Sequence, residues 1–213
     1  MFGRRSKRYG CRRVKTLSRE NKGLLYLFFK DNWDYIAKLG PIFALTSLIF
    51  IYSIFIGYSI APDVSPQSFE GVLSNIPDPV DSTSFEMFLA ILYNNVFASF
   101  LFMLSGVFLG LPPLMFMAFN GFFVGYVSYN AAQIQGIGFV LATILPHGII
   151  EIPAIVLCGT MGVGLGYQLI FKLMRREGLQ KYATESLMIF LKRIIPLLVL
   201  AAGIETALIY SLI

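Results

Sequence analysis

Lysine and arginine are missing from the whole middle of this sequence. None of its 17 basic residues lies between Leu39 and Phe171; eleven precede that interval and six follow it, from Lys172 to Arg193. Charged residues of both signs make up only 14% of the chain, against roughly 25% in a typical soluble domain. A chain so poor in charge is typical of a membrane protein and excludes an ordinary soluble domain.

Cysteine and histidine are also scarce, with two and one residues respectively. Cys11 and Cys158 are too few for a disulfide framework or a cysteine-rich metal cluster. The single histidine, His147, leaves no second imidazole for the HExxH pattern of zinc peptidases. No complete catalytic motif is present, so the sequence predicts a protein that is not an enzyme and that needs no cofactor or metal.

Apolar residues, by contrast, make up 56% of the chain. They gather in stretches of the roughly 20 residues that cross a bilayer, at 39–60, 86–109, 112–133 and 194–213. The stretch 138–171 is longer, and a single crossing there keeps both groups of basic residues on one side of the membrane. The sequence predicts an all-α, polytopic membrane helix bundle of about five transmembrane helices, with a kinked or partly re-entrant fourth.

The charge distribution also predicts the organisation and orientation of the chain. Basic residues near the ends of spans are retained in the cytoplasm, so we expect a multi-pass protein of the plasma membrane with a cytoplasmic N-terminus and an outer C-terminus. The basic N-terminal region faces anionic lipid headgroups, and nucleic-acid binding is not expected. The predicted segments are a disordered arm 1–19, an amphipathic interfacial helix 20–38, a membrane domain 39–213, its outer loop 61–84 and a cytoplasmic connector 172–189.

Three ionisable residues fall inside the predicted spans: His147, Glu151 and Glu205. Such residues are costly at bilayer depth and by default indicate function. His147 and Glu151 are four residues apart, so a helix places them side by side. Pro146 and Pro153 bracket the pair, and each removes one backbone hydrogen bond of the helix. If any metal bound here, His147 and Glu151 would be its ligands.

Amides and small residues complete the predicted interior. Asn94, Asn95 and Asn120 join His147, Glu151 and Glu205 in a predicted intramembrane polar cluster. Glycines four residues apart allow helix backbones to approach closely, and three such pairs occur: Gly106 with Gly110, Gly121 with Gly125, and Gly162 with Gly166. We expect these glycines to form helix-packing faces and the chain to form a homodimer through them.

These residues together resemble the stage II sporulation protein M family of small membrane proteins. The resemblance is carried by Asn94-Asn95, by Asn120-Gly121 with Gly125, and by the segment from Leu145-Pro146-His147-Gly148 to Glu151-Ile152-Pro153 followed by Gly162. It implies a five-span fold from about Leu39 to the end of the chain. In endospore-forming bacteria it implies a scaffold that joins peptidoglycan-degrading enzymes in a septal complex.

Three functions remain open from the sequence. The first is a non-enzymatic membrane scaffold or remodelling component that acts with other membrane or envelope proteins. The second is a transporter or channel component in which His147, Glu151 and Glu205 line an ion or proton path. The third is an intramembrane metalloenzyme that uses His147 and Glu151.

Overall fold

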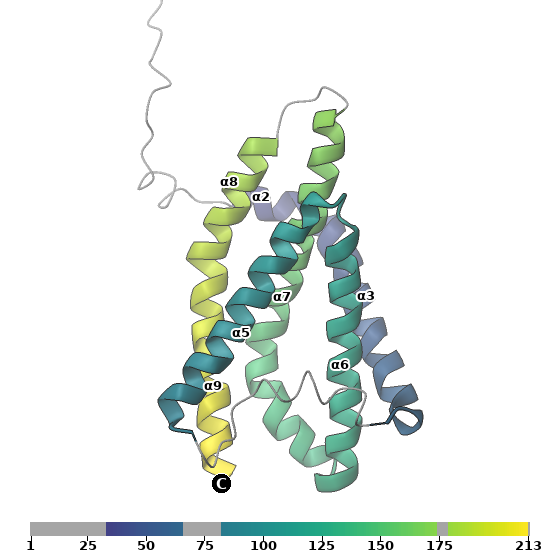
Figure 1. Cartoon of the computed structure of the whole chain (residues 1–213), viewed down its shortest axis with the longest axis vertical. Coiled ribbons are helices and arrows are strands. Elements are labelled where there is room, and N and C mark those ends of the chain that lie inside the picture. The colour runs from purple at the N-terminus through teal and green to yellow at the C-terminus, as the bar shows by residue number, and fades with distance from the viewer. Residues whose placement is uncertain (1–32, 66–81, 174–178, 213) are drawn as a thin grey trace, which may run out of the picture. The chain divides into compact units, whose positions relative to one another are not determined.

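The computed structural model describes residues 33–65, 82–173 and 179–212, which are helical almost throughout. In chain order its elements are α2 (Trp33–Lys38), α3 (Gly40–Ile60), the 3₁₀ turn η1 (Ala61–Asp63), α5 (Ser84–Leu104), the 3₁₀ turn η3 (Ser105–Val107), α6 (Leu111–Gln135), α7 (Ile137–Leu173), α8 (Leu179–Ile189), the π-turn η4 (Phe190–Ile194) and α9 (Ile195–Leu212) (Figure 1). The predicted arm 1–19, most of the interfacial helix and residues 66–81 of the outer loop lie outside these ranges.

Five helical segments are long and apolar enough to cross a membrane: Gly40–Asp63, Ser84–Val107, Leu111–Gln135, Gly148–Ile170 and Leu179–Ser211. The predicted all-α bundle of five spans is therefore confirmed. Local signals set the helix ends. Thr83 and Glu86 form a reciprocal capping box at the start of α5, which satisfies otherwise unpaired backbone N–H groups.

The fourth span belongs to one continuous helix, α7, with Pro146 and Pro153 inside it. The structure therefore shows a single helix through this segment rather than two. Gly136, at φ 85°, ends α6, and α7 begins at the next residue, so the chain reverses within a single residue. Figure 1 shows the first part of α7 running at an angle to the rest of the helix. The apolar segment that can span starts only after Pro146, at Gly148.

The turn between α5 and α6 is tight, and the two helices contact each other only a little. Leu109 and Gly110 both adopt positive φ, and α6 begins immediately with Leu111, Pro112 and Pro113. Beyond this turn α6 packs chiefly against α3 and α7, whereas α5 packs against α7 and α9. The helix α7 thus lies beside both α5 and α6.

Glycines allow α3 and α6 to touch backbone to backbone. A methyl group on Gly121 would overlap the carbonyl oxygen of Phe50, and one on Gly125 would overlap that of Ile54. On the other helix, Gly57 has no room for a methyl group against the backbone of Phe122. The predicted packing role of Gly121 and Gly125 is therefore realised within the chain.

A second set of glycines holds α7 against the turn between α5 and α6. Gly106 faces the carbonyl oxygen of Gly162, and Gly166 faces the backbone of Gly110. All six glycines proposed for helix packing are thus buried between helices of one chain. A homodimer would have to use a different face.

The end of the bundle that holds α2 and α8, here called the α8 end, is closed by tyrosines. The Tyr35 and Ser186 hydroxyl oxygens lie 2.6 Å apart, which links α2 to α8. The Tyr182 hydroxyl donates to the carbonyl oxygen of Met161 in α7 at 3.3 Å. The two tyrosine rings meet edge to face, with centroids 5.1 Å apart. Burial and the neighbouring Tyr182 raise the pKa of Tyr35, so its hydroxyl stays neutral.

The glycine contacts predict a specific sensitivity. Replacing Gly162 with alanine places a methyl group on the carbonyl oxygen of Phe102, and relief requires α7 to move as a whole. We expect the free energy of unfolding in detergent to fall by about 1–3 kcal/mol. Gly203→Ala is the matched control, because nothing lies within 4 Å of its added methyl group; its effect should stay within about 0.5 kcal/mol. Equal stabilities for the two variants would contradict this packing.

Candidate functional site

Two of the three ionisable residues expected in the spans are brought together. Glu151 in α7 and Glu205 in α9 are close enough for their carboxyl groups to interact electrostatically. Both side chains are half-buried, and their helices pack against each other. Two negative charges at this depth would repel one another with little solvent screening. Ionisation of both carboxyl groups would therefore raise the free energy of the folded protein.

His147 lies on the same helix, one turn before Glu151. Its backbone is helical, between Pro146 and the buried Gly148. Its side chain lies outside the described part of the structure, so the predicted pairing of His147 with Glu151 stays a prediction.

The three amides are placed differently from the two carboxyl groups. The side-chain nitrogen of Asn120 donates to the carbonyl oxygen of Phe116, 2.8 Å away in its own helix. Asn95 is half-buried in α5 and Asn94 is exposed. Glu151 and Glu205 therefore lie within electrostatic range of each other, and Asn120 is bonded to its own backbone. They do not show the predicted polar residues as one closed cluster.

A buried hydroxyl pair was missed by the sequence analysis. The side-chain oxygens of Thr46 in α3 and Thr160 in α7 lie 2.8 Å apart, and both residues are fully buried. Each hydroxyl also bonds the backbone of its own helix. The two threonines are 114 positions apart in the sequence, and no sequence pattern indicates that they would meet. Only the fold reveals this contact.

The chemistry of the described site is that of carboxyl and amide groups without a metal-binding set. Among the described residues no group of three or more His, Cys, Asp or Glu side chains could hold a metal ion. Cys158 is buried, and its neighbours in the α7 core are largely apolar. What the described residues offer is hydrogen bonding and, at the Glu151–Glu205 pair, exchange of a proton or a cation.

Comparison with known proteins agrees with the resemblance in the sequence. The family model of "SpoIIM: Stage II sporulation protein M" matches residues 46–208. An uncharacterised protein of Methanocaldococcus jannaschii is 30% identical over 169 residues, which cover 75% of this chain and 74% of the relative. A second uncharacterised protein of that organism is 32% identical over 122 residues, 55% of this chain and 68% of the relative. No solved structure matches the chain.

The carboxyl pair generates a prediction for a double-mutant cycle. Glu151→Gln and Glu205→Gln should have non-additive effects on the free energy of unfolding in detergent, with a coupling of about 0.5–3 kcal/mol. Glu86→Gln is the control partner, because Glu86 lies exposed at the start of α5 and bonds Thr83. Its effect should add to that of Glu151→Gln. A Glu151–Glu205 cycle that is also additive would show that the two carboxyl groups do not interact.

Proposed function

The chain belongs to the stage II sporulation protein M family and is a multi-pass membrane protein, and we propose that it acts as a non-enzymatic scaffold that binds protein partners within the membrane. The observation that carries this proposal is the position of Asn94. It is the eleventh of the 21 residues of α5, in the middle of a span, and its side chain is exposed.

An amide at that depth needs a partner. Lipid tails offer no hydrogen bonds, and an unsatisfied polar group in hydrocarbon costs several kcal/mol. Asparagine side chains in spans commonly hydrogen-bond across helices. A helix of another protein, or of a second copy of this chain, would satisfy Asn94.

The packing of the chain's own helices supports the same function. Backbone contacts at Gly121, Gly125, Gly162 and Gly166 hold α3, α6 and α7 at close range. Close-packed interiors resist deformation, so the bundle presents a fixed outer face on α5. A fixed face suits a protein that organises partners, and the homodimer becomes a proposal based on this face rather than on the glycines.

We further propose that the α8 end of the bundle lies in the cytoplasm and that the protein resides in the plasma membrane. Lys38 of α2 and Lys181 of α8 lie at this end, where the Tyr35–Ser186 contact joins the two helices. The acidic residue Asp63 lies just after α3, and Glu86 lies in the first turn of α5. Both positions are at the ends of these spans that are away from the α8 end. This arrangement follows the rule that basic residues remain inside.

The scaffold proposal is tested by cross-linking from a single position. A photoreactive amino acid at Asn94 should give discrete protein adducts in intact membranes, either with a second copy or with one envelope protein. The control is the same group at Ile51, which lies at the middle of α3 and is 50% exposed. If the amount of adduct formed from position 94 does not exceed the amount formed from position 51, the scaffold proposal is wrong.

The Glu151–Glu205 pair favours a second candidate, transport of protons or cations through the bundle. Purified protein in liposomes, given a pH step or a potassium gradient, separates the two functions. The scaffold proposal expects leak rates equal to those of protein-free liposomes. A flux about tenfold or more above that level, lost in both Glu151→Gln and Glu205→Gln, would replace the scaffold with the transporter.

A further inference from the structure

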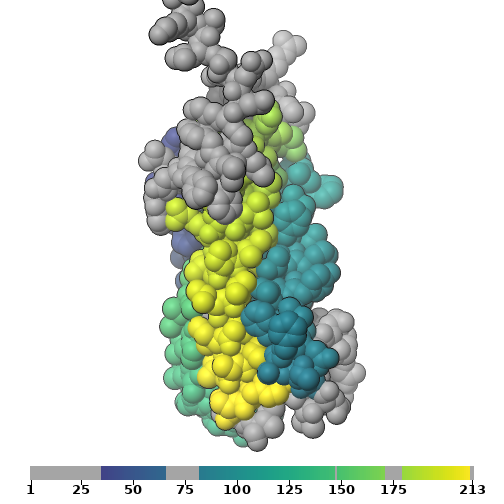
Figure 2. Space-filling model, turned by 90° about the vertical axis from the view of Figure 1, so that its left-hand side faces the viewer, coloured from purple at the N-terminus to yellow at the C-terminus, as the bar shows by residue number. Residues whose placement is uncertain are grey.

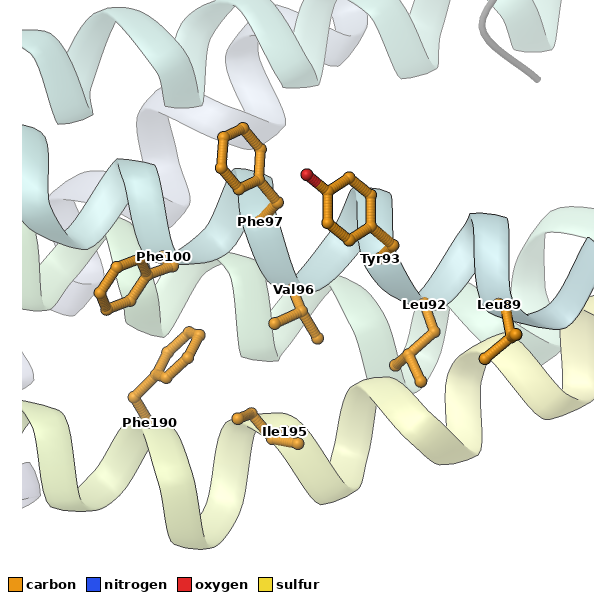
Figure 3. Close-up of a pocket in the computed structure, with 8 residues that line it drawn as sticks. All are labelled: Leu89, Leu92, Tyr93, Val96, Phe97, Phe100, Phe190 and Ile195. Carbon is orange, nitrogen blue, oxygen red and sulfur yellow. The ribbon is translucent and has the colours of Figure 1, made fainter.

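An apolar groove runs between α5 and the helix formed by η4 and α9. Its volume is about 440 Å³, and Figure 2 shows the two walls side by side on one face of the bundle. In Figure 3, Leu89, Leu92 and Val96 point from α5 toward the other wall, and Phe190 and Ile195 point back. The lining residues are Leu89, Leu92, Tyr93, Val96, Phe97, Phe100, Phe190 and Ile195.

Contacts at both ends fix the two walls of the groove. At the α8 end the rings of Phe100 and Phe190 meet with centroids 5.4 Å apart. At the other end the Tyr210 hydroxyl donates to the carbonyl oxygen of Ser82 at 2.5 Å. Because these contacts hold α5 and α9 at both ends, the groove exists before anything binds in it.

Positive charge lies at one end of the groove. The π-turn η4 contains Lys192 and Arg193, between the lining residues Phe190 and Ile195. Both basic side chains are half-buried. From Leu179 to Ile194 the chain holds three basic residues and one acidic residue, Glu185, so this stretch carries a net positive charge. π-turns interrupt regular helices and occur often at functional sites.

We propose that the groove binds an anionic phospholipid, with an acyl chain along α5 and the phosphate beside Lys192 and Arg193. From Leu89 to Phe100 the groove follows about three turns of helix, roughly 16 Å, about half of a hydrocarbon core roughly 30 Å thick. One acyl chain of one leaflet has that length. The site goes beyond the proposed scaffold function and is independent of it.

The lipid site and the proposed partner face lie on different sides of α5. At 3.6 residues per turn, Asn94 stands roughly 120–160° around the helix from Leu89, Leu92, Val96 and Phe100, whereas Phe97, on the rim of the groove, lies about 60° from it. A partner helix at Asn94 therefore leaves the groove open to lipid. A second copy that filled the groove instead would exclude lipid, which gives the test its alternative outcome.

The experiment uses a single tryptophan in the groove wall. Trp33→Phe removes the only tryptophan. Leu92→Trp introduces one at a lining position whose side chain points toward the other wall (Figure 3); this is the groove variant. The control variant carries Ile51→Trp instead, at a similar distance from the α8 end of its helix and exposed on α3. Each protein is placed in vesicles of brominated phosphatidylcholine mixed with increasing amounts of unbrominated phosphatidylglycerol. Bromine on the acyl chains quenches tryptophan fluorescence on contact.

In the groove variant we expect phosphatidylglycerol to displace the brominated lipid from the indole with about a fivefold preference, since each basic residue near the surface favours anionic lipid. In the control variant the preference should be close to one. Lys192→Gln with Arg193→Gln should remove the preference in the groove variant and leave quenching by brominated phosphatidylcholine intact. Should that combination fail to fold, about 1 M salt applied to the groove variant with both basic residues present should remove the preference by screening.

Two results would overturn the proposal. The first is an equal preference in the groove and control variants, which would show ordinary boundary lipid in the groove. The second is a groove tryptophan that brominated lipid does not quench, together with spin–spin broadening between chains labelled at position 92. That result would assign the groove to a second copy of the chain.

Discussion

The structure depends on the close contact between α7 and the turn that joins α5 to α6. Gly106 and Gly162 meet there through backbone atoms, and one turn further on Gly110 meets Gly166. Between lipid-embedded helices there is no hydrophobic driving force, so close van der Waals packing has to hold them together. With α7 fixed in this position, α5 and α6 contact each other only a little; besides α7, α6 packs mainly on α3 and α5 mainly on α9.

This arrangement decides which polar groups meet. Because α7 lies between its neighbours, Thr160 meets Thr46 on one side, and on the other Glu151 lies within electrostatic range of Glu205. The same packing leaves the outer face of α5 uncovered, with Asn94 in the middle of the span. Interior hydrogen bonds and backbone contacts hold the bundle together, whereas the exposed amide lies on a face that the chain's own helices do not cover.

The sequence by itself determined the class, the number of spans and most of their ends. Length, hydropathy and the absence of Lys and Arg between Leu39 and Phe171 are local properties, and a bilayer constrains each span separately. The effect of Pro146 and Pro153 within α7 could also be predicted, because a proline removes one hydrogen bond of its own helix whatever packs around it. The pairing of glycines four residues apart was predicted as a packing feature, but not which helix each one meets.

Only the tertiary structure decided the partners. It turned the glycine faces inward, joined Thr46 to Thr160 and brought Glu205 within electrostatic range of Glu151. It also left Asn94 exposed and formed a groove next to Lys192 and Arg193. Such contacts depend on how each helix is rotated about its axis, which packing between helices fixes. A uniformly apolar span carries little periodic signal for that rotation, so the sequence could not reveal it.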